Sequence, residues 1–153
     1  MRAVDAAAGT DAEDRSVTLA AALVATLAVP VLPILHIGNR FSTRRTLAVV
    51  ARLGRIPFPK LACEPRQIGR GVNGAARVLR LQGTTCLARS QLVWLLLSLC
   101  GRRPVIRLGS EVGLGSGTFA HAWVELDGIP IGDSANVVER HPPFDRPLLG
   151  PVT

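Results

Sequence analysis

The first half of the chain carries the spacing of apolar residues that is typical of helices. Residues 17–29 are apolar on all sides, and we expect the prolines that follow them to end this helix. In 42–54, apolar residues recur on one helical face, with Ser42 or Thr43 placed to cap the helix and Gly54 placed to stop it. The sequence therefore predicts two helices before residue 55.

Two further helices are predicted in the middle of the chain. Residues 66–81 have apolar positions at helical spacing, although three glycines weaken this pattern. The next helix begins after Thr84 or Thr85, its candidate N-caps, and ends at Gly101. Because residues 92–97 are consecutively apolar, this helix should be packed on nearly every side and form the centre of the core.

After Pro104 the pattern changes from helical spacing to alternation. We expect a strand and a glycine-rich loop over 104–115, a second strand over 119–126 and a short partner strand over 129–133. The proline-rich tail that follows should wrap the surface. Helices followed by a small antiparallel sheet predict an α+β fold, in which N-terminal helices and a central helix pack on the sheet.

Composition supports a compact fold, because 48% of the residues are hydrophobic and 19% are charged. We expect a disordered segment over 1–15, an N-terminal helical region over 16–62 and a catalytic core over 63–153. Residues 16–153 should form one compact domain, as is typical of a chain of this length.

The charge distribution favours an acidic partner. The formal net charge is +7, and between Arg15 and Ser110 the only acid is Glu64. Such a stretch suits a peptide, another protein or an anionic membrane, or else it is a solvated basic surface. Nucleic acid is disfavoured, because the chain has no tyrosine and few other aromatic residues on which bases could stack.

The apolar segment 17–37 is long enough to cross a membrane, but two prolines interrupt it. Few basic residues precede it, which argues against a secretory signal. The three cysteines form no close pair, so we expect no disulfide framework and a reducing compartment. We therefore expect a cytoplasmic protein in which this segment is a buried or surface-associated helix that could touch a membrane; a true membrane span is the alternative.

Cys86 lies in the first turn of the central helix, where a thiol is favoured as a nucleophile. The unpaired N–H groups and the positive end of the helix stabilise a thiolate and lower the pKa of the thiol. The same N–H groups can bind the oxyanion that forms when the thiolate attacks a carbonyl. Cys63, in a loop, and Cys100, at the far end of the helix, fit structural roles better.

Catalysis by cysteine needs an imidazole that accepts the thiol proton and returns it to the leaving amine. His36 lies in the apolar N-terminal segment and His141 opens the proline-rich tail, whereas His121 lies on a predicted strand. His121 is therefore the candidate base, and a buried structural imidazole is the alternative.

The acid that orients His121 depends on the turn after its strand. If Asp127 and Gly128 form a two-residue type I′ turn, Asp133 points away from His121. If the loop has three residues and Gly128 is left-handed in a bulge, Asp133 lies directly opposite His121. Asp127 suits the turn position before a glycine, so Asp133 is the candidate partner, on condition that the loop is the longer one.

CLARS at the start of a long apolar helix, followed by AHAWVELDGIPIGD, resembles the stand-alone B2 proteins of lasso peptide biosynthesis. Those are transglutaminase-like cysteine peptidases that remove the leader from a ribosomally made precursor. The likeness covers most of the chain and is weakest over 1–40. It implies a transglutaminase/papain-like core, with Cys86 as the nucleophile, His121 as the general base and acid, and Asp133 as the orienting acid.

The resemblance also implies partners. A small leader-binding protein would hold the leader of the lasso precursor peptide, and an asparagine-synthetase-like cyclase would receive the freed core. Cleavage should need no metal and no cofactor. Gln82 could donate to the oxyanion site, and Trp123 could wall the substrate groove or belong to the core. Two other functions stay open: an acyltransferase that uses the same three residues, and a non-catalytic, membrane-associated scaffold.

Overall fold

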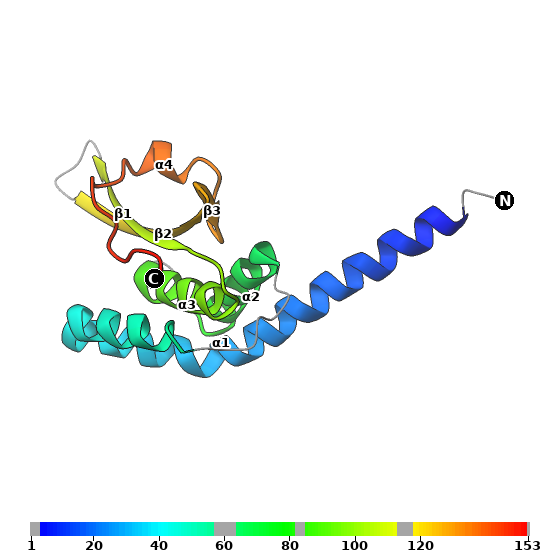
Figure 1. Cartoon of the computed structure of the whole chain (residues 1–153), viewed down its shortest axis with the longest axis horizontal. Coiled ribbons are helices and arrows are strands. Elements are labelled where there is room, and N and C mark those ends of the chain that lie inside the picture. Colours follow the sequence, from blue (N-terminus) through cyan, green and yellow to red (C-terminus); the bar gives the residue numbers. More distant parts are fainter. Residues whose placement is uncertain (1–3, 57–63, 82–84, 113–117, 153) are drawn as a thin grey trace.

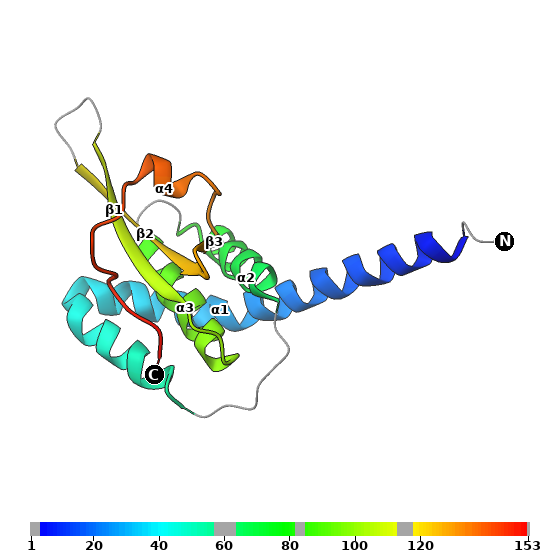
Figure 2. The same cartoon turned by 45° about the horizontal axis from the view of Figure 1, so that its top comes forward.

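The structure is a computed structural model that describes residues 4–56, 64–81, 85–112 and 118–152, with side chains from residue 22 onward except at 111, 112, 118 and 119. The element order is helices first and then a sheet. The first three helices form a layer on one face of the sheet, and a short last helix lies beyond the sheet (Figures 1 and 2). The predicted α+β class is confirmed.

The first helix, α1 (Val4–Leu53), turns back on itself at Ser42 (Figures 1 and 2). Ser42 has extended backbone angles, φ −162° and ψ 98°, inside an otherwise helical segment. Its Oγ accepts a hydrogen bond from the N–H of Arg45 at 3.3 Å, so Ser42 caps the segment that follows it. The predicted cap is thereby confirmed.

Two predictions for the N-terminal segment are corrected. The helix continues through Pro30 and Pro33, because burial of residues such as Leu32 and Leu35 in the core offsets the backbone hydrogen bonds that the prolines remove. Residues 4–15, predicted to be disordered, are helical, in keeping with the high helix propensity of their many alanines. The domain boundary proposed at residue 62 stays a prediction.

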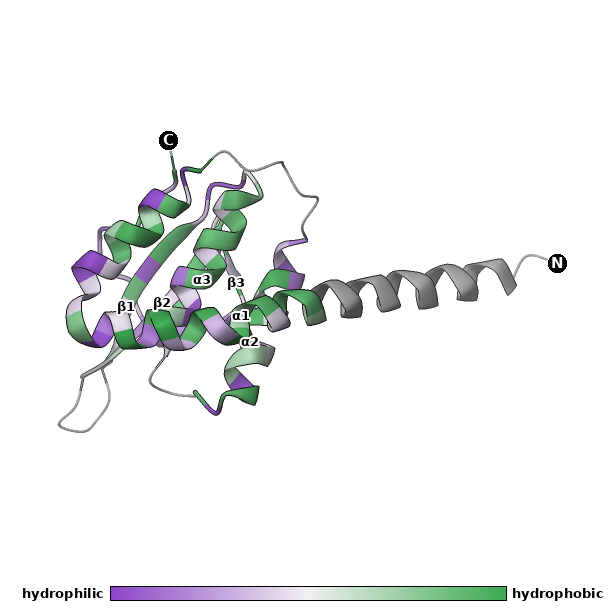
Figure 3. Cartoon of the chain, turned by 90° about the horizontal axis from the view of Figure 1, so that it is seen from below, coloured by the Kyte–Doolittle hydropathy of each residue, from purple (hydrophilic) through white to green (hydrophobic). Residues whose placement is uncertain are grey.

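Part of α1, Ala22–Leu53, is long and apolar enough to cross a membrane by length and composition. Figure 3 shows hydrophobic residues along much of this segment. Leu23, Leu27 and Ile34 are each 67% exposed, although other positions pack against α2 and α3. An apolar helix with an exposed face is therefore present, and its contact with a membrane stays a prediction.

Two shorter helices complete the helical layer, α2 (Pro65–Val78) and α3 (Cys86–Leu99). α3 contacts α1, α2, and the first two strands of the sheet, and its Trp94 and Leu97 are fully buried. Gln91 and Asn39 exchange two amide hydrogen bonds, of 2.8 and 3.0 Å, that fasten α3 to α1. The prediction that this helix forms the centre of the core is confirmed.

The sheet is antiparallel, in the order β1-β2-β3, with β1 (Val105–Val112), β2 (Thr118–Leu126) and β3 (Ile129–Ile131). The C-terminal segment covers the outer edge of β1 through the bridges Ile106–Leu149 and Gly109–Pro143. β3 is therefore the other edge of the sheet. The short helix α4 (Val137–Arg140) connects β3 to this C-terminal segment.

Cys100 is disulfide-bonded, whereas Cys86 is a free cysteine. The expectation that the cysteines stay reduced is wrong at Cys100, because spacing along the sequence does not reveal which positions the fold brings together. Because Cys100 forms a disulfide, the number and spacing of the cysteines no longer indicate a reducing compartment. Cys86 is not part of a disulfide, so its thiol can react.

Candidate active site

Cys86 begins α3, and Thr85 is the N-cap residue, as predicted. The Thr85 hydroxyl does not cap the helix, however, because it donates to the backbone carbonyl of Leu81. Because the Thr85 side chain does not cap α3, it leaves the N–H groups of the first turn available to an anion. The thiol therefore lies where a thiolate or an oxyanion is stabilised.

His121 lies on β2 and is bonded to Asp133. The distance from His121 Nε2 to Asp133 Oδ2 is 2.7 Å, and both side chains are 20% exposed. Asp133 Oδ1 accepts a hydrogen bond from the N–H of Ser134 at 2.8 Å, which fixes the carboxylate. His121 also makes a hydrogen bond with Cys86, for which its Nδ1 is the remaining ring nitrogen. The structure thus brings together the three predicted catalytic residues.

The charges of these three groups support one another. The hydrogen bond with Asp133, followed by that with Cys86, raises the pKa of His121 to about 9. Burial pushes the pKa of the Cys86 thiol upward, but hydrogen bonds with His121 and with the backbone of Ala122 outweigh it and lower that pKa. Burial also opposes ionisation of Asp133, yet its hydrogen bonds lower the pKa of the carboxyl. These shifts favour the charged form of each group, that is, thiolate, imidazolium and carboxylate.

The turn after β2 is not the three-residue loop on which the choice of Asp133 as the orienting acid depended. Leu126 pairs with Ile129, so the loop consists of Asp127 and Gly128 alone. Their φ angles of +52° and +77° are those of a type I′ turn. The prediction of a three-residue loop is therefore wrong, and by register alone Asp133 would point away from the imidazole of His121.

Gly132 brings Asp133 to His121 despite this register. Regular pairing with β2 ends at Ile131, and Gly132 has a φ of +76°, which glycine adopts far more readily than other residues. The backbone of Gly132 also lies against α2, where a Cβ built on Gly69 would be only 2.7 Å from the Gly132 Cα. The close contact between these two glycines, rather than the hairpin register, thus positions the acid.

Two residues that the sequence did not single out support the site from α3. Ser90 Oγ donates to the carbonyl of Ala122 at 2.9 Å and so fastens β2 to α3 beside the imidazole. The charge of Arg89 contributes to lowering the pKa of Asp133. Both follow Cys86 by three or four residues, a spacing that places them on its helical face. This spacing from Cys86 is the feature of the sequence from which their position beside the site could have been predicted.

The remaining histidine and the minor candidates occupy different surroundings. His141, assigned to the tail, is buried against His121, with ring centroids 4.8 Å apart. Trp123 is 1% exposed and donates from Nε1 to Glu125 Oε1 at 2.9 Å, so of its two predicted roles the structure supports the one in the core. Residues 122–126 are all buried, so both faces of β2 are covered in this part of the strand. Gln82 lies outside the described residues.

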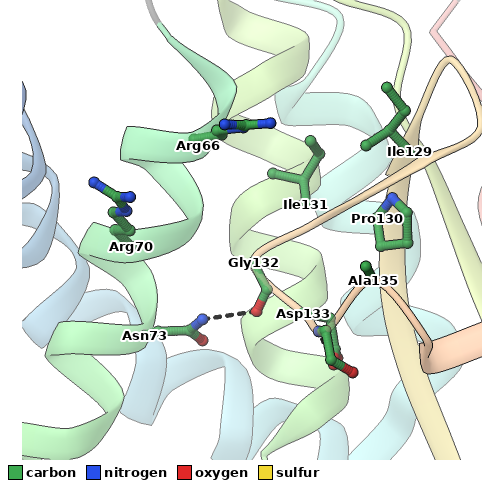
Figure 4. A pocket seen from close by; sticks show the side chains of 10 residues that line it. Arg66, Arg70, Asn73, Ile129, Pro130, Ile131, Gly132, Asp133 and Ala135 are labelled. Atoms are coloured by element: carbon green, nitrogen blue, oxygen red, sulfur yellow. Dashed lines mark hydrogen bonds between the residues drawn. The ribbon is translucent and has the colours of Figure 1, made fainter.

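A groove of about 640 Å³ lies beside Asp133, between α2 and β3 (Figure 4). Residues of this groove, including Gly132 and Asp133, also line a small cavity that contains Cys86. The groove therefore adjoins the cavity that Cys86 lines. Within the described part of the chain, no three His, Cys, Asp or Glu side chains are grouped as a metal ion would require.

A thiol at a helix start, hydrogen-bonded to an imidazole that a carboxylate orients, is the arrangement of enzymes that use cysteine to attack acyl groups. Residues 25–144 match the sequence model of the transglutaminase-like superfamily, and the chain belongs to this superfamily. Cysteine proteases and transferases are typical of it. No curated protein and no solved structure matches the chain. The expected transglutaminase-like core is thereby confirmed.

Proposed function

We propose that the chain is a cysteine peptidase that removes the leader from a lasso precursor peptide. The observation that carries the proposal is the hydrogen-bonded series Cys86–His121–Asp133 at the start of α3. Membership of the transglutaminase-like superfamily supports the acyl chemistry. The resemblance of CLARS and AHAWVELDGIPIGD to stand-alone B2 proteins supports the choice of substrate.

In the first half of the reaction, the Cys86 thiolate attacks the carbonyl carbon of the leader–core amide. A C–S bond forms, and the backbone N–H of Cys86 stabilises the oxyanion. When this intermediate collapses, the C–N bond breaks and the His121 imidazolium gives its proton to the amine of the core. The leader is then held on Cys86 as a thioester.

In the second half, water attacks the thioester while neutral His121 takes a proton from it. The C–S bond breaks, the leader leaves as a carboxylic acid, and the Cys86 thiolate is restored. Asp133 keeps the imidazole oriented through Nε2 and stabilises its charged form in both halves. An acyltransferase would differ only in that an amine takes the place of water.

We further propose that a small leader-binding protein presents the precursor and that an asparagine-synthetase-like cyclase receives the core. The positive net charge of +7 suits acidic partners of this kind. For location, we propose the cytoplasm. We also propose peripheral membrane contact through 17–37, which the exposed leucines of α1 support.

The test is cleavage of the precursor peptide encoded beside the gene, in the presence of the leader-binding protein encoded with it. One specific cut is expected, and the leader should end in a free carboxylic acid by mass spectrometry. Cys86→Ala should lower the cleavage rate at least about a thousandfold, because it removes the thiol that forms the thioester. Its thermal unfolding transition serves as the control for folding.

Two outcomes would overturn this proposal. Undiminished cleavage by Cys86→Ala would show that Cys86 is not the nucleophile. A leader that carries an added amine at its new C-terminus would assign the same three residues to acyl transfer.

A further inference from the structure

The groove beside Asp133 has one basic wall and one apolar wall. Arg66 and Arg70, from α2, line one side, and Ile129 and Pro130, at the edge of the sheet, line the other (Figure 4). Ile129 is 62% exposed, so an apolar side chain faces solvent at this edge. The groove therefore offers both charge and apolar surface to a ligand.

The charges of Arg66 and Arg70 do not contribute to the stability of the fold through ion pairs among the described residues. Both side chains are exposed, and among the described residues neither has a carboxylate partner, since Glu125 and Asp133 pair elsewhere. Arg66 and Arg70 are four residues apart, a spacing at which like charges disfavour a helix. Arg66 also lies in the first turn of α2, where the positive end of the helix disfavours a cation. Charges placed against local stability in this way are typical of binding sites.

Asn73 connects this basic wall to the catalytic residues. It follows the two arginines at helical spacing, on the same face of α2. Its Nδ2 donates to the carbonyl of Gly132 at 2.7 Å, and its Oδ1 accepts from Arg89 Nη1 at 3.1 Å. Because Gly132 immediately precedes Asp133, a peptide in the groove would lie alongside the residue that orients the imidazole.

We propose that this groove binds an acidic segment of the peptide substrate. Arg66 and Arg70 contact its carboxylates, because the planar guanidinium group matches a carboxylate with two parallel hydrogen bonds. Ile129 contacts a neighbouring apolar side chain. The inference rests on the proposed peptidase function, for which it names the residues that select the substrate.

Binding is measured without turnover on the full chain carrying Cys86→Ala. The probes are a fluorescein-labelled peptide of alternating alanine and glutamate and its glutamine counterpart, followed by fluorescence anisotropy. The glutamate probe should bind at least about tenfold more tightly, and Arg66→Gln with Arg70→Gln should remove about tenfold of that affinity.

A matched double variant tests whether net charge alone explains the binding. Arg52 and Arg77 are exposed arginines that do not line the groove, so replacing both by glutamine removes the same charge. This control should keep most of the affinity for the glutamate probe. Equal losses in the two double variants, or no preference for glutamate, would overturn the proposal.

Protection of the thiol then locates the bound peptide. A saturating glutamate probe should slow alkylation of Cys86 by iodoacetamide several-fold in the otherwise unaltered chain, and not in the groove variant. Binding without protection would place the acidic site elsewhere and would also overturn the proposal. Since neither assay requires cleavage, a failure of the peptidase proposal would appear separately, in the precursor assay.

Discussion

Asp133→Asn should lower kcat/KM for leader cleavage by about 10²- to 10⁴-fold while leaving the protein folded. Asparagine can keep a hydrogen bond to Nε2 of His121, but it removes the negative charge that stabilises the imidazolium. The hydrogen bond with Asp133 is the largest contribution to the His121 pKa of about 9, so that pKa should fall toward its ordinary value of 6.5. The falling limb of the pH–rate profile should move to lower pH with it, because the proton donor is lost earlier.

Asp127→Asn is the matched control for this substitution. Asp127 is exposed in the turn between β2 and β3, and its φ of +52° is one that asparagine tolerates well. Its variant should cleave at nearly the unaltered rate. If Asp133→Asn also cleaved at the unaltered rate with an unshifted pH profile, the carboxylate would not act through His121.

Gly69→Ala should destabilise the protein by about 1–3 kcal/mol and reduce cleavage, although Gly69 touches no reacting atom. A Cβ at this position would lie 2.7 Å from the Cα and 2.8 Å from the N of Gly132. Because neither backbone can yield as a flexible side chain would, α2 must move away from Gly132. Asp133, the next residue, would then lose its alignment with the imidazole.

Gly74→Ala, on the same helix, should have the opposite effect on stability. The added Cβ would meet only the Cβ of Ala25, at 4.0 Å, which is an ordinary contact. Alanine favours a helix over glycine by about 0.5–1 kcal/mol, so this variant should be slightly more stable and fully active. Urea unfolding of both variants measures the difference, and equal stabilities would contradict the proposed role of the Gly69–Gly132 contact.

The sequence predicted the parts of the fold that depend on local periodicity. The helix that begins at Cys86 and the strand that carries His121 follow from apolar spacing, and their pairing follows from the chemistry of cysteine nucleophiles. The persistence of α1 beyond Pro30 could not be predicted, because tertiary burial decides it.

The position of the acid was predicted for an incorrect reason. Hairpin register depends on the turn, and a two-residue turn and a three-residue turn place Asp133 on opposite faces. The left-handed φ of Gly132 overrides that register, and a contact with Gly69, far away in the sequence, holds it in place. The packing of His141 on His121 likewise depends on how the tail folds back, which periodicity does not encode.

The central claim is that Cys86 is a thiolate paired with the imidazolium of His121 before any substrate binds. The most direct measurement is the rate of Cys86 alkylation by iodoacetamide as a function of pH, followed by mass spectrometry. We predict a midpoint below the ordinary value of 9.0, an upward shift in His121→Ala, and no shift in His36→Ala. A midpoint at or above 9.0 that does not respond to His121→Ala would contradict the account.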